Sequence, residues 1–189
     1  MFMRKLGILI IFVLIVSVIF LIGLRKPSDG EPTSDDQTLT IAASFVPIVA
    51  HTQAVVGDLY HVVSLIPLNV EPHDFDPTPS DIAAFDRADI IFLHDIRFEN
   101  TLAQLITDRS KIVDTSEGSP VENSLSTDFY DPHSWLDPSH AMFQVGVIRD
   151  ALIRLDPDHA DFFRSNAEQY IEKIQFLDAA YFEMLQRAS

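Results

Sequence analysis

The sequence contains no cysteine. Without cysteine the chain has no disulfide bonds, thiolate metal sites or cysteine nucleophiles, so any transition-metal site must use His, Asp and Glu. That set of ligands is open to zinc, manganese and iron. The 189 residues are enough for one ordinary domain with a short appendage.

Basic residues are also scarce, because 13 Lys and Arg stand against 28 Asp and Glu, and the net charge is −15. Four of the basic residues flank an apolar run near the N-terminus, namely Arg4, Lys5, Arg25 and Lys26, so the rest of the chain is more acidic still. A nucleic-acid partner is excluded, since neutralising phosphates requires Lys and Arg. The acidic excess is interpreted mainly as a solvated surface.

An uncharged apolar run extends from Leu6 to Leu24, close to the ~20 residues that a helix needs to cross a bilayer. Arg4 and Lys5 precede it, which favours an N-terminus left in the cytoplasm. The run is longer than the apolar core of a signal peptide and ends without a small-residue cleavage site. We therefore expect residues 1–26 to be a signal anchor that forms an N-terminal transmembrane helix, with a cleaved signal peptide as the alternative. The rest of the chain is then extracytoplasmic and tethered to the membrane.

Residues 27–38 are rich in Pro, Gly, Ser and Asp and are interpreted as a flexible tether. After this tether, short β-branched runs alternate with helical patterns, which predicts an α/β lobe with a parallel four-stranded sheet flanked by helices. The expected strands are 39–43, 61–66, 89–94 and 111–113. The expected helices are 47–56, 79–86, 99–107, 138–155 and 157–163, followed by a longer helix from about residue 165.

Two tripeptides of an acid, a proline and a histidine stand out. The first is in EPHDFDPTPSD, residues 71–81, where three prolines stiffen a loop that carries His73. The second is in DPHSWLDP, residues 131–138, and carries His133. Two imidazoles on separate loops could bind one metal ion, with a carboxylate orienting each ring. The candidates for that orienting role are Glu71, Asp74, Asp131 and Asp137. The alternative is that each tripeptide is an acidic turn with a solvent-exposed His.

These motifs carry a family resemblance. LTIAASFVPI, GDLYHVVSLIP, EPHDFDPTPSDIAAFDRADIIFLHDIRFE and DPHSWLDPSHA resemble, in order and spacing, the zinc/manganese solute-binding proteins of ABC importers. This family includes proteins also described as adhesins. The resemblance implies a two-lobed receptor whose lobes are joined by one long helix, with the metal ion held between them.

The resemblance also implies a ligand set and a domain organisation. Residues 39–164 correspond to the N-terminal metal-receptor lobe, and residues 165–189 correspond to the start of the connecting helix. The N-terminal lobe supplies two ligands, which map onto His73 and His133. A Glu or His and an Asp come from the C-terminal lobe, which this chain does not contain.

The chain departs from the family pattern in two loops that border the expected site. It has Leu68-Asn69-Val70 where relatives often have Pro-Gly, and His94-Asp95-Ile96-Arg97 where they favour Asn-Gly. His94 is expected to be a hydrogen-bonded structural residue, with contact to the ligand or a partner as the alternative. Glu99 is expected to fix the following helix. Trp135 is expected to be a packing anchor under the second loop.

The expected function is that of a non-enzymatic receptor that delivers zinc or manganese to an ABC importer permease. Two alternatives remain open at this point. One is a truncated, non-transporting remnant or surface-displayed fragment. The other is a metal-dependent hydrolase that uses the same His and Asp residues, although no hydrolase motif is present.

Overall fold

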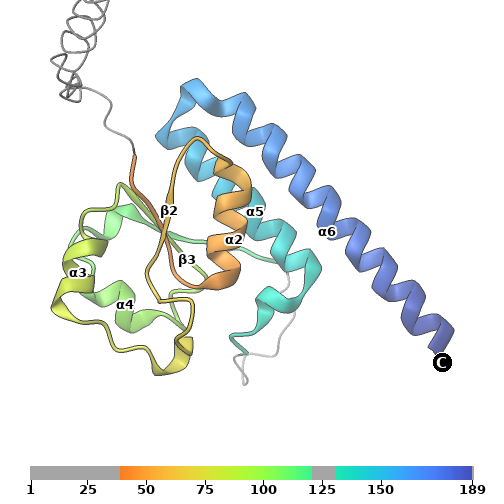
Figure 1. Ribbon diagram of the computed structural model, residues 1–189, viewed down its shortest axis with the longest axis horizontal. Helices are drawn as coiled ribbons and strands as arrows, with labels where there is room; N and C mark the ends of the chain where they lie inside the picture. The colour runs from red at the N-terminus through yellow and green to blue at the C-terminus, as the bar shows by residue number, and fades with distance from the viewer. Residues whose placement is uncertain (1–38, 121–130, 189) are drawn as a thin grey trace, which may run out of the picture. The chain divides into compact units, whose positions relative to one another are not determined.

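The structure is a computed structural model that describes residues 39–120 and 131–188. Four parallel strands form one sheet in the order β2-β1-β3-β4. Their bounds are β1 Ile41–Ala43, β2 Val62–Ser64, β3 Ile90–Leu93 and β4 Ile112–Asp114. The predicted parallel four-stranded α/β architecture is confirmed (Figure 1). The predicted N-terminal transmembrane helix and the tether up to residue 38 lie outside the described residues.

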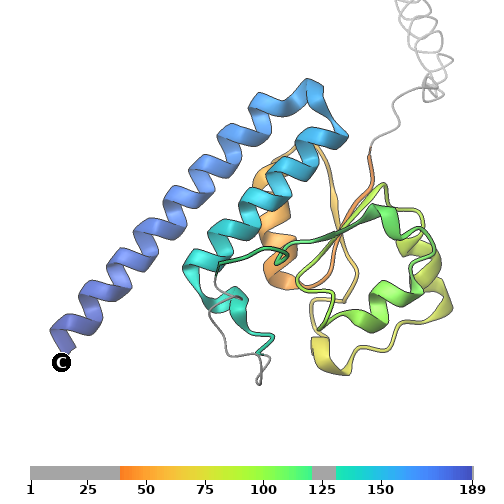
Figure 2. The ribbon, with the colours of Figure 1, turned by 180° about the vertical axis from the view of Figure 1, so that it is seen from behind.

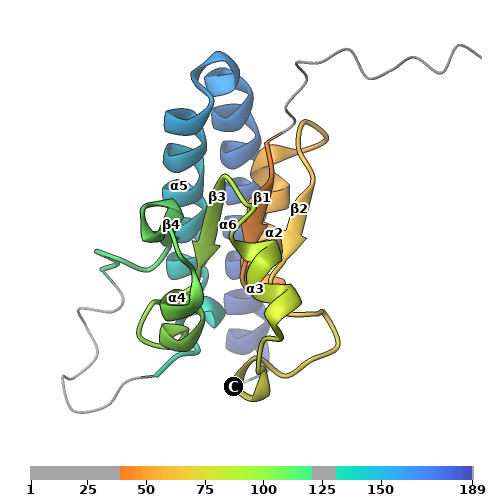
Figure 3. The same cartoon turned by 90° about the vertical axis from the view of Figure 1, so that its left-hand side faces the viewer.

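Helices cover both faces of the sheet. α3 (Pro79–Phe85) and α4 (Asn100–Leu105) lie on one face, whereas α2 (Val46–Val56), α5 (Pro138–Leu155) and α6 (Ala160–Ala188) lie on the other (Figures 1 and 3). Seen from behind, α5 and α6 run side by side in opposite directions (Figure 2). In the part of the chain that the structure describes, no helix is long and apolar enough to cross a membrane.

The helices near the carboxyl ends of the strands begin where the sequence has caps. Thr78 and Asp81 form a reciprocal capping box at the start of α3, and Pro79 occupies the first turn. At the start of α5, an Asp137 side-chain oxygen accepts hydrogen bonds from the backbone N–H groups of Ser139 and His140. Such caps are worth about 1 kcal/mol each and fix where the chain enters each helix.

The C-terminal helix begins earlier than the sequence predicts. The separate helix expected over 157–163 is wrong, because Pro157–His159 form a 3-10 turn and α6 then runs without a break from Ala160. The structure therefore has no helix boundary near residue 165. Phe163 and Ala167, four residues apart, are both fully buried on one face of α6. The Asn166 side chain donates to the Val55 carbonyl at 3.0 Å and so joins α6 to α2.

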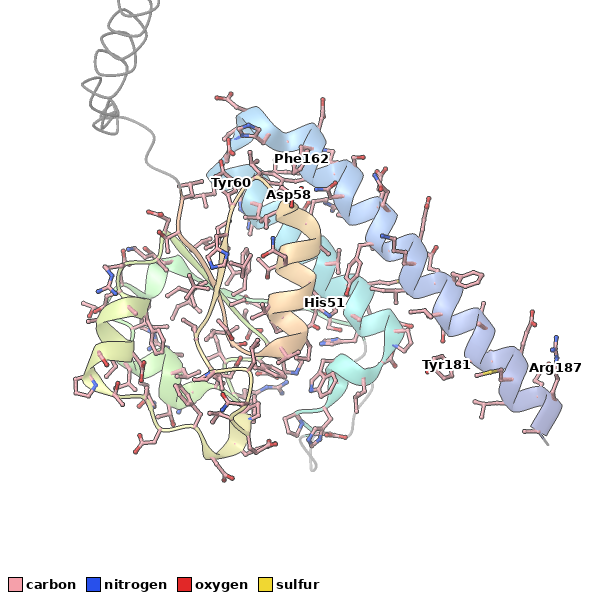
Figure 4. All side chains as sticks on the ribbon, viewed as in Figure 1. His51, Asp58, Tyr60, Phe162, Tyr181 and Arg187 are labelled. Carbon is pink, nitrogen blue, oxygen red and sulfur yellow. The ribbon has the colours of Figure 1, made fainter. Side chains whose placement is uncertain are left out.

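Within the described ranges, the first half of α6 packs against the hydrophobic core. Tyr170, Ile171 and Ile174 contact the hydrophobic core. Beyond them the apolar side chains are exposed, from 55% for Leu177 to 74% for Phe176. Tyr181 and Arg187 mark this exposed half in Figure 4. The apolar side chains of α6 therefore pack against the hydrophobic core over its first half and are exposed to solvent over its second half.

Candidate metal site

The site lies where the sheet changes its direction of winding. The chain passes from β1 to β2 on one side and returns to β3 on the other, so a switch point lies between β1 and β3. In open α/β sheets, ligands bind beyond the carboxyl ends of the strands at such a point. The loops after β2, β3 and β4 all leave the sheet at this end, and it is there that the chain carries its two acid–Pro–His tripeptides.

His73 lies in a short 3-10 turn, Pro72–Asp74, after β2. Pro72 opens the turn, and the Asp74 backbone N–H donates to the Glu71 carbonyl at 3.0 Å. The His73 ring lies edge-on to the Phe98 ring, with ring centres 4.8 Å apart. Phe98 lies in the loop after β3, whereas His73 lies in the loop after β2. The contact between the two rings therefore holds these loops together.

His133 has the orienting carboxylate that the motif predicts. Asp131 Oδ1 accepts the backbone N–H of His133 at 3.0 Å and lies 2.8 Å from its ring Nδ1. Because a carboxylate oxygen only accepts, Nδ1 carries the proton and Nε2 keeps a free lone pair. These bonds, the backbone one first, lower the pKa of Asp131 below its ordinary value. Of the four candidate carboxylates, Asp131 therefore takes this role at His133, whereas Asp137 caps α5.

The structure brings His73 and His133 together. Their ring centres lie 5.8 Å apart and their planes are inclined by 51°. A metal–nitrogen bond of ~2.1 Å places an imidazole centre about 3.2 Å from the ion, so two rings sharing one ion lie at most about 6.4 Å apart. The observed spacing fits a shared ion. The His133 side chain is half exposed, which leaves it accessible to an ion from solvent.

An open pocket of about 440 Å³ surrounds the two rings. Its wall is largely apolar and includes Phe45, Leu68, Phe98 and Trp135. The Trp135 and Phe45 rings meet edge to face with centres 6.1 Å apart, which confirms Trp135 as a packing anchor under the second loop. Apolar walls limit access of water to bound ions and strengthen electrostatic interactions with the ligands.

Below the pocket, the loop after β3 is held by buried polar groups. His94 is fully buried and Glu99 is 4% exposed. Glu99 Oε2 accepts the backbone N–H groups of His94 at 2.6 Å and of Asp95 at 3.1 Å. Burial raises the pKa of the Glu99 carboxyl to about 7 and lowers that of the His94 imidazole to about 4. The Glu99 side chain therefore fixes the loop before α4, and it makes no capping hydrogen bond to that helix.

The remaining described histidines lie away from this pair of rings or in the core. His51 and His140 are buried, whereas His61 and His159 are exposed. The expected hydrogen-bonded role of His94 is confirmed, because its ring bonds to Pro132 and Gln144. Gln144, in the middle of α5, was missed by the sequence reasoning, since a single glutamine in a helical pattern carries no signal of its own.

The described ranges contain no larger group of candidate metal ligands. Within residues 39–120 and 131–188, no group of three or more His, Asp or Glu side chains is placed to hold one ion. Within these residues, His73 and His133 are therefore a pair of imidazoles with no third candidate ligand grouped beside them. Two nitrogens leave further coordination positions of a zinc or manganese ion to be filled by other ligands.

A parallel α/β layer with two imidazoles beside its switch point places these rings where open sheets of this class bind small ligands. Residues 41–189 match the family described as ZnuA, the periplasmic component A of the zinc-uptake complex. The chain belongs to this family.

Named relatives include metal-binding lipoproteins and transport components. The manganese-binding lipoprotein MntA of Halalkalibacterium halodurans is 34% identical over 171 residues, which are 88% of this chain and 57% of that protein. The high-affinity zinc uptake system protein ZnuA of Bacillus subtilis is 31% identical over 175 residues, 83% of this chain and 54% of that protein. The chain thus spans little more than half the length of the curated relatives it matches.

Solved structures show the same fold. The metal-dependent lipoprotein YcdH of Bacillus subtilis superposes with a TM-score of 0.69 at 32% identity, over 76% of this chain and 54% of that chain. The zinc-bound ZnuA-like domain of Streptococcus pneumoniae AdcA gives a TM-score of 0.66 at 32% identity, over 77% of this chain and 55% of that chain.

Proposed function

We propose that this chain is the N-terminal lobe of an extracytoplasmic receptor that captures zinc or manganese for an ABC importer. His73 and His133 are the ligands that this lobe contributes. The observation that carries the proposal is the 5.8 Å separation of these two imidazoles, which belong to loops 60 residues apart and meet at the sheet's switch point. The relatives that bind manganese or zinc support the same choice of ligand.

The further ligands and partners belong to the same proposal. A Glu or His and an Asp from a second lobe would complete the coordination of the ion, and the permease of the importer would receive it. The N-terminal segment 1–26 would tether the receptor to the membrane, with residues 27–38 as a flexible link. Residues 39–164 would form the lobe, and the helix beyond them would lead to the second lobe.

A receptor is favoured over the metal-dependent hydrolase. The named relatives are binding proteins and transport components, and the carboxylate nearest to His133 is engaged in orienting its ring. A hydrolase would need an additional general base beside an activated water. Asp131 is not free for that role while it holds the Nδ1 proton of His133.

Calorimetric titration of the purified chain with zinc and with manganese tests the proposal. The wild-type chain is expected to bind one ion weakly, because residues 39–120 and 131–188 bring only two candidate ligands together. The His73→Ala/His133→Ala double variant should lose at least ~100-fold in affinity, since both protein ligands are gone. The matched control His61→Ala removes an exposed histidine elsewhere and should bind as the wild type does. Equal binding by the double variant and the wild type would refute the assignment of the ligands.

Replacing Asp131 by Asn should weaken zinc binding about tenfold, because the charge that raises the basicity of the His133 ring is lost. Asp74→Asn is the matched control. Asp74 follows His73 in the 3-10 turn Pro72–Asp74, so this variant also removes one negative charge next to a proposed ligand. The affinity of that control should change by less than about threefold if ring orientation is the cause. Equal losses in the two variants would indicate a general effect of acidic charge, and not an orienting hydrogen bond.

A further inference from the structure

His94 reaches from the sheet to the loop that carries His133. Its side chain is fully buried at the end of β3, and its ring Nε2 lies 2.9 Å from the backbone carbonyl oxygen of Pro132. A carbonyl oxygen only accepts hydrogen bonds, so Nε2 carries the proton and donates it. Pro132 immediately precedes His133, and this bond therefore fixes the backbone one residue before the metal ligand.

The tautomer that this bond requires is enforced from α5. A neutral imidazole has a single N–H group, so Nδ1 of His94 must be an acceptor when Nε2 donates. The Gln144 side-chain amide supplies a donor 2.8 Å from Nδ1. The same amide nitrogen donates to the Thr115 hydroxyl at 2.9 Å, which holds Gln144 in place.

The main chain of His94 is fixed as firmly as its ring. Its backbone N–H is bound by the Glu99 carboxyl at 2.6 Å, and its carbonyl accepts the Ser116 hydroxyl at 2.5 Å. The Phe45 ring meets the imidazole edge to face, with centres 5.7 Å apart. The backbone and the ring of His94 are thus both held in place by contacts with buried neighbours.

The described residues around His133 form one short element of regular structure. His133 is followed by a 3-10 turn of only three residues, Ser134–Leu136. Isolated 3-10 turns have poor hydrogen-bond geometry and contribute little stability. The donor from His94 therefore acts together with the Asp131 hydrogen bond and the Trp135 packing in fixing the backbone beside His133.

We infer that His94 is a positioning residue for the metal ligand His133, acting through the Pro132 carbonyl and held in the donating tautomer by Gln144. The inference rests on the proposed function of His133 as a metal ligand. Positioning matters because a pre-formed site needs its ligands held within a fraction of an ångström. Metal affinity should then depend on a residue that never contacts the ion.

The test compares His94→Gln with His94→Asn in the full chain. The longer Gln side chain can still place a donor near the Nε2 position, whereas the Asn side chain is too short to reach Pro132. His51→Asn is the matched control, because it replaces another buried histidine, on α2, whose ring bonds to Tyr170. Zinc affinity is measured by calorimetry, and hydrogen exchange of the amides of residues 133–137 is measured without metal.

His94→Asn is expected to weaken zinc binding about tenfold and to speed exchange in residues 133–137. His94→Gln should stay within about threefold of the wild type in affinity. His51→Asn should lower thermal stability but leave both readouts unchanged. If His94→Asn matches His94→Gln in both readouts, or if His51→Asn weakens binding equally, the positioning role is refuted.

A second variant covers the case in which His94→Asn does not fold. Gln144→Leu leaves His94 in place but removes the donor to Nδ1, so the ring loses one of the hydrogen bonds that hold its Nε2 against the Pro132 carbonyl. It should speed exchange in residues 133–137, and unchanged exchange would count against the inference. If the wild-type chain binds no zinc or manganese, the proposed function fails, while the exchange data still decide whether His94 anchors the loop.

Discussion

Replacing Phe163 with alanine is expected to lower the free energy of unfolding by roughly 4 kcal/mol. Phe163 is fully buried, and its ring lies 6.5 Å from the Tyr60 ring and 6.4 Å from that of His159, centre to centre. The alanine would leave a cavity at the point where α6 begins to pack on the domain. Neighbouring Phe162 and Tyr60 mark this corner in Figure 4.

The matched control is Phe182→Ala, later in the same helix. Phe182 is 62% exposed, so its loss should change stability by no more than about 0.5 kcal/mol. Urea denaturation of the two variants beside the wild type gives both values. Similar losses for Phe163 and Phe182 would mean that the outer half of α6 packs against something in solution.

Replacing Glu99 with Gln should make the chain far more sensitive to acid. Burial lowers the pKa of His51 and of His94 to about 4, from 6.5 in the unfolded chain. Between pH 6.5 and 4 the unfolded chain therefore binds protons at these histidines that the folded chain does not bind. Their contribution to stability falls by about 2 kcal/mol each between pH 7 and 5.

Glu99 acts in the opposite direction. Burial raises its pKa to about 7, from 4.5 in the unfolded chain, so between those values the folded chain holds a proton that the unfolded chain has lost. Its contribution to stability rises by about 2 kcal/mol as the pH falls from 7 to 5. Glu99→Gln removes this compensation while Gln can still accept the N–H of His94. The variant should lose roughly 4 kcal/mol over that interval, and the wild type about half as much.

Denaturant unfolding at pH 5, 6, 7 and 8 measures the difference. The control Glu117→Gln changes an exposed carboxylate in the loop after β4, and its curve should parallel that of the wild type. Parallel curves for Glu99→Gln and the wild type would show that Glu99 is ionised in the folded chain at neutral pH.

Elements with local signals were predicted closely. The bounds of α5 match the prediction over Pro138–Leu155, because Asp137 and Pro138 define its first turn chemically. The buried run at β3 was predicted within a residue at each end. Both features depend on residues that are neighbours in the sequence, so they can be predicted without knowledge of the fold.

Features that depend on distant contacts could not be predicted in the same way. The sequence offered four carboxylates to orient the two rings, and only the geometry places Asp131 2.8 Å from His133 Nδ1. The hydrogen bonds of His94 reach Pro132 and Gln144, which are 38 and 50 residues further along the chain. The continuity of α6 likewise depends on Asn166 finding the Val55 carbonyl in α2.

The half-packed α6 has a mechanical consequence. A helix of 29 residues is ~44 Å long, and about half of that length lies beyond Ile174, the last residue in contact with the core. A tilt of about 5° at the packed end moves the far end by ~2 Å. α6 can therefore act as a lever arm. A force applied at Tyr181 would produce a torque on the packed half of the helix, where Phe163 is buried.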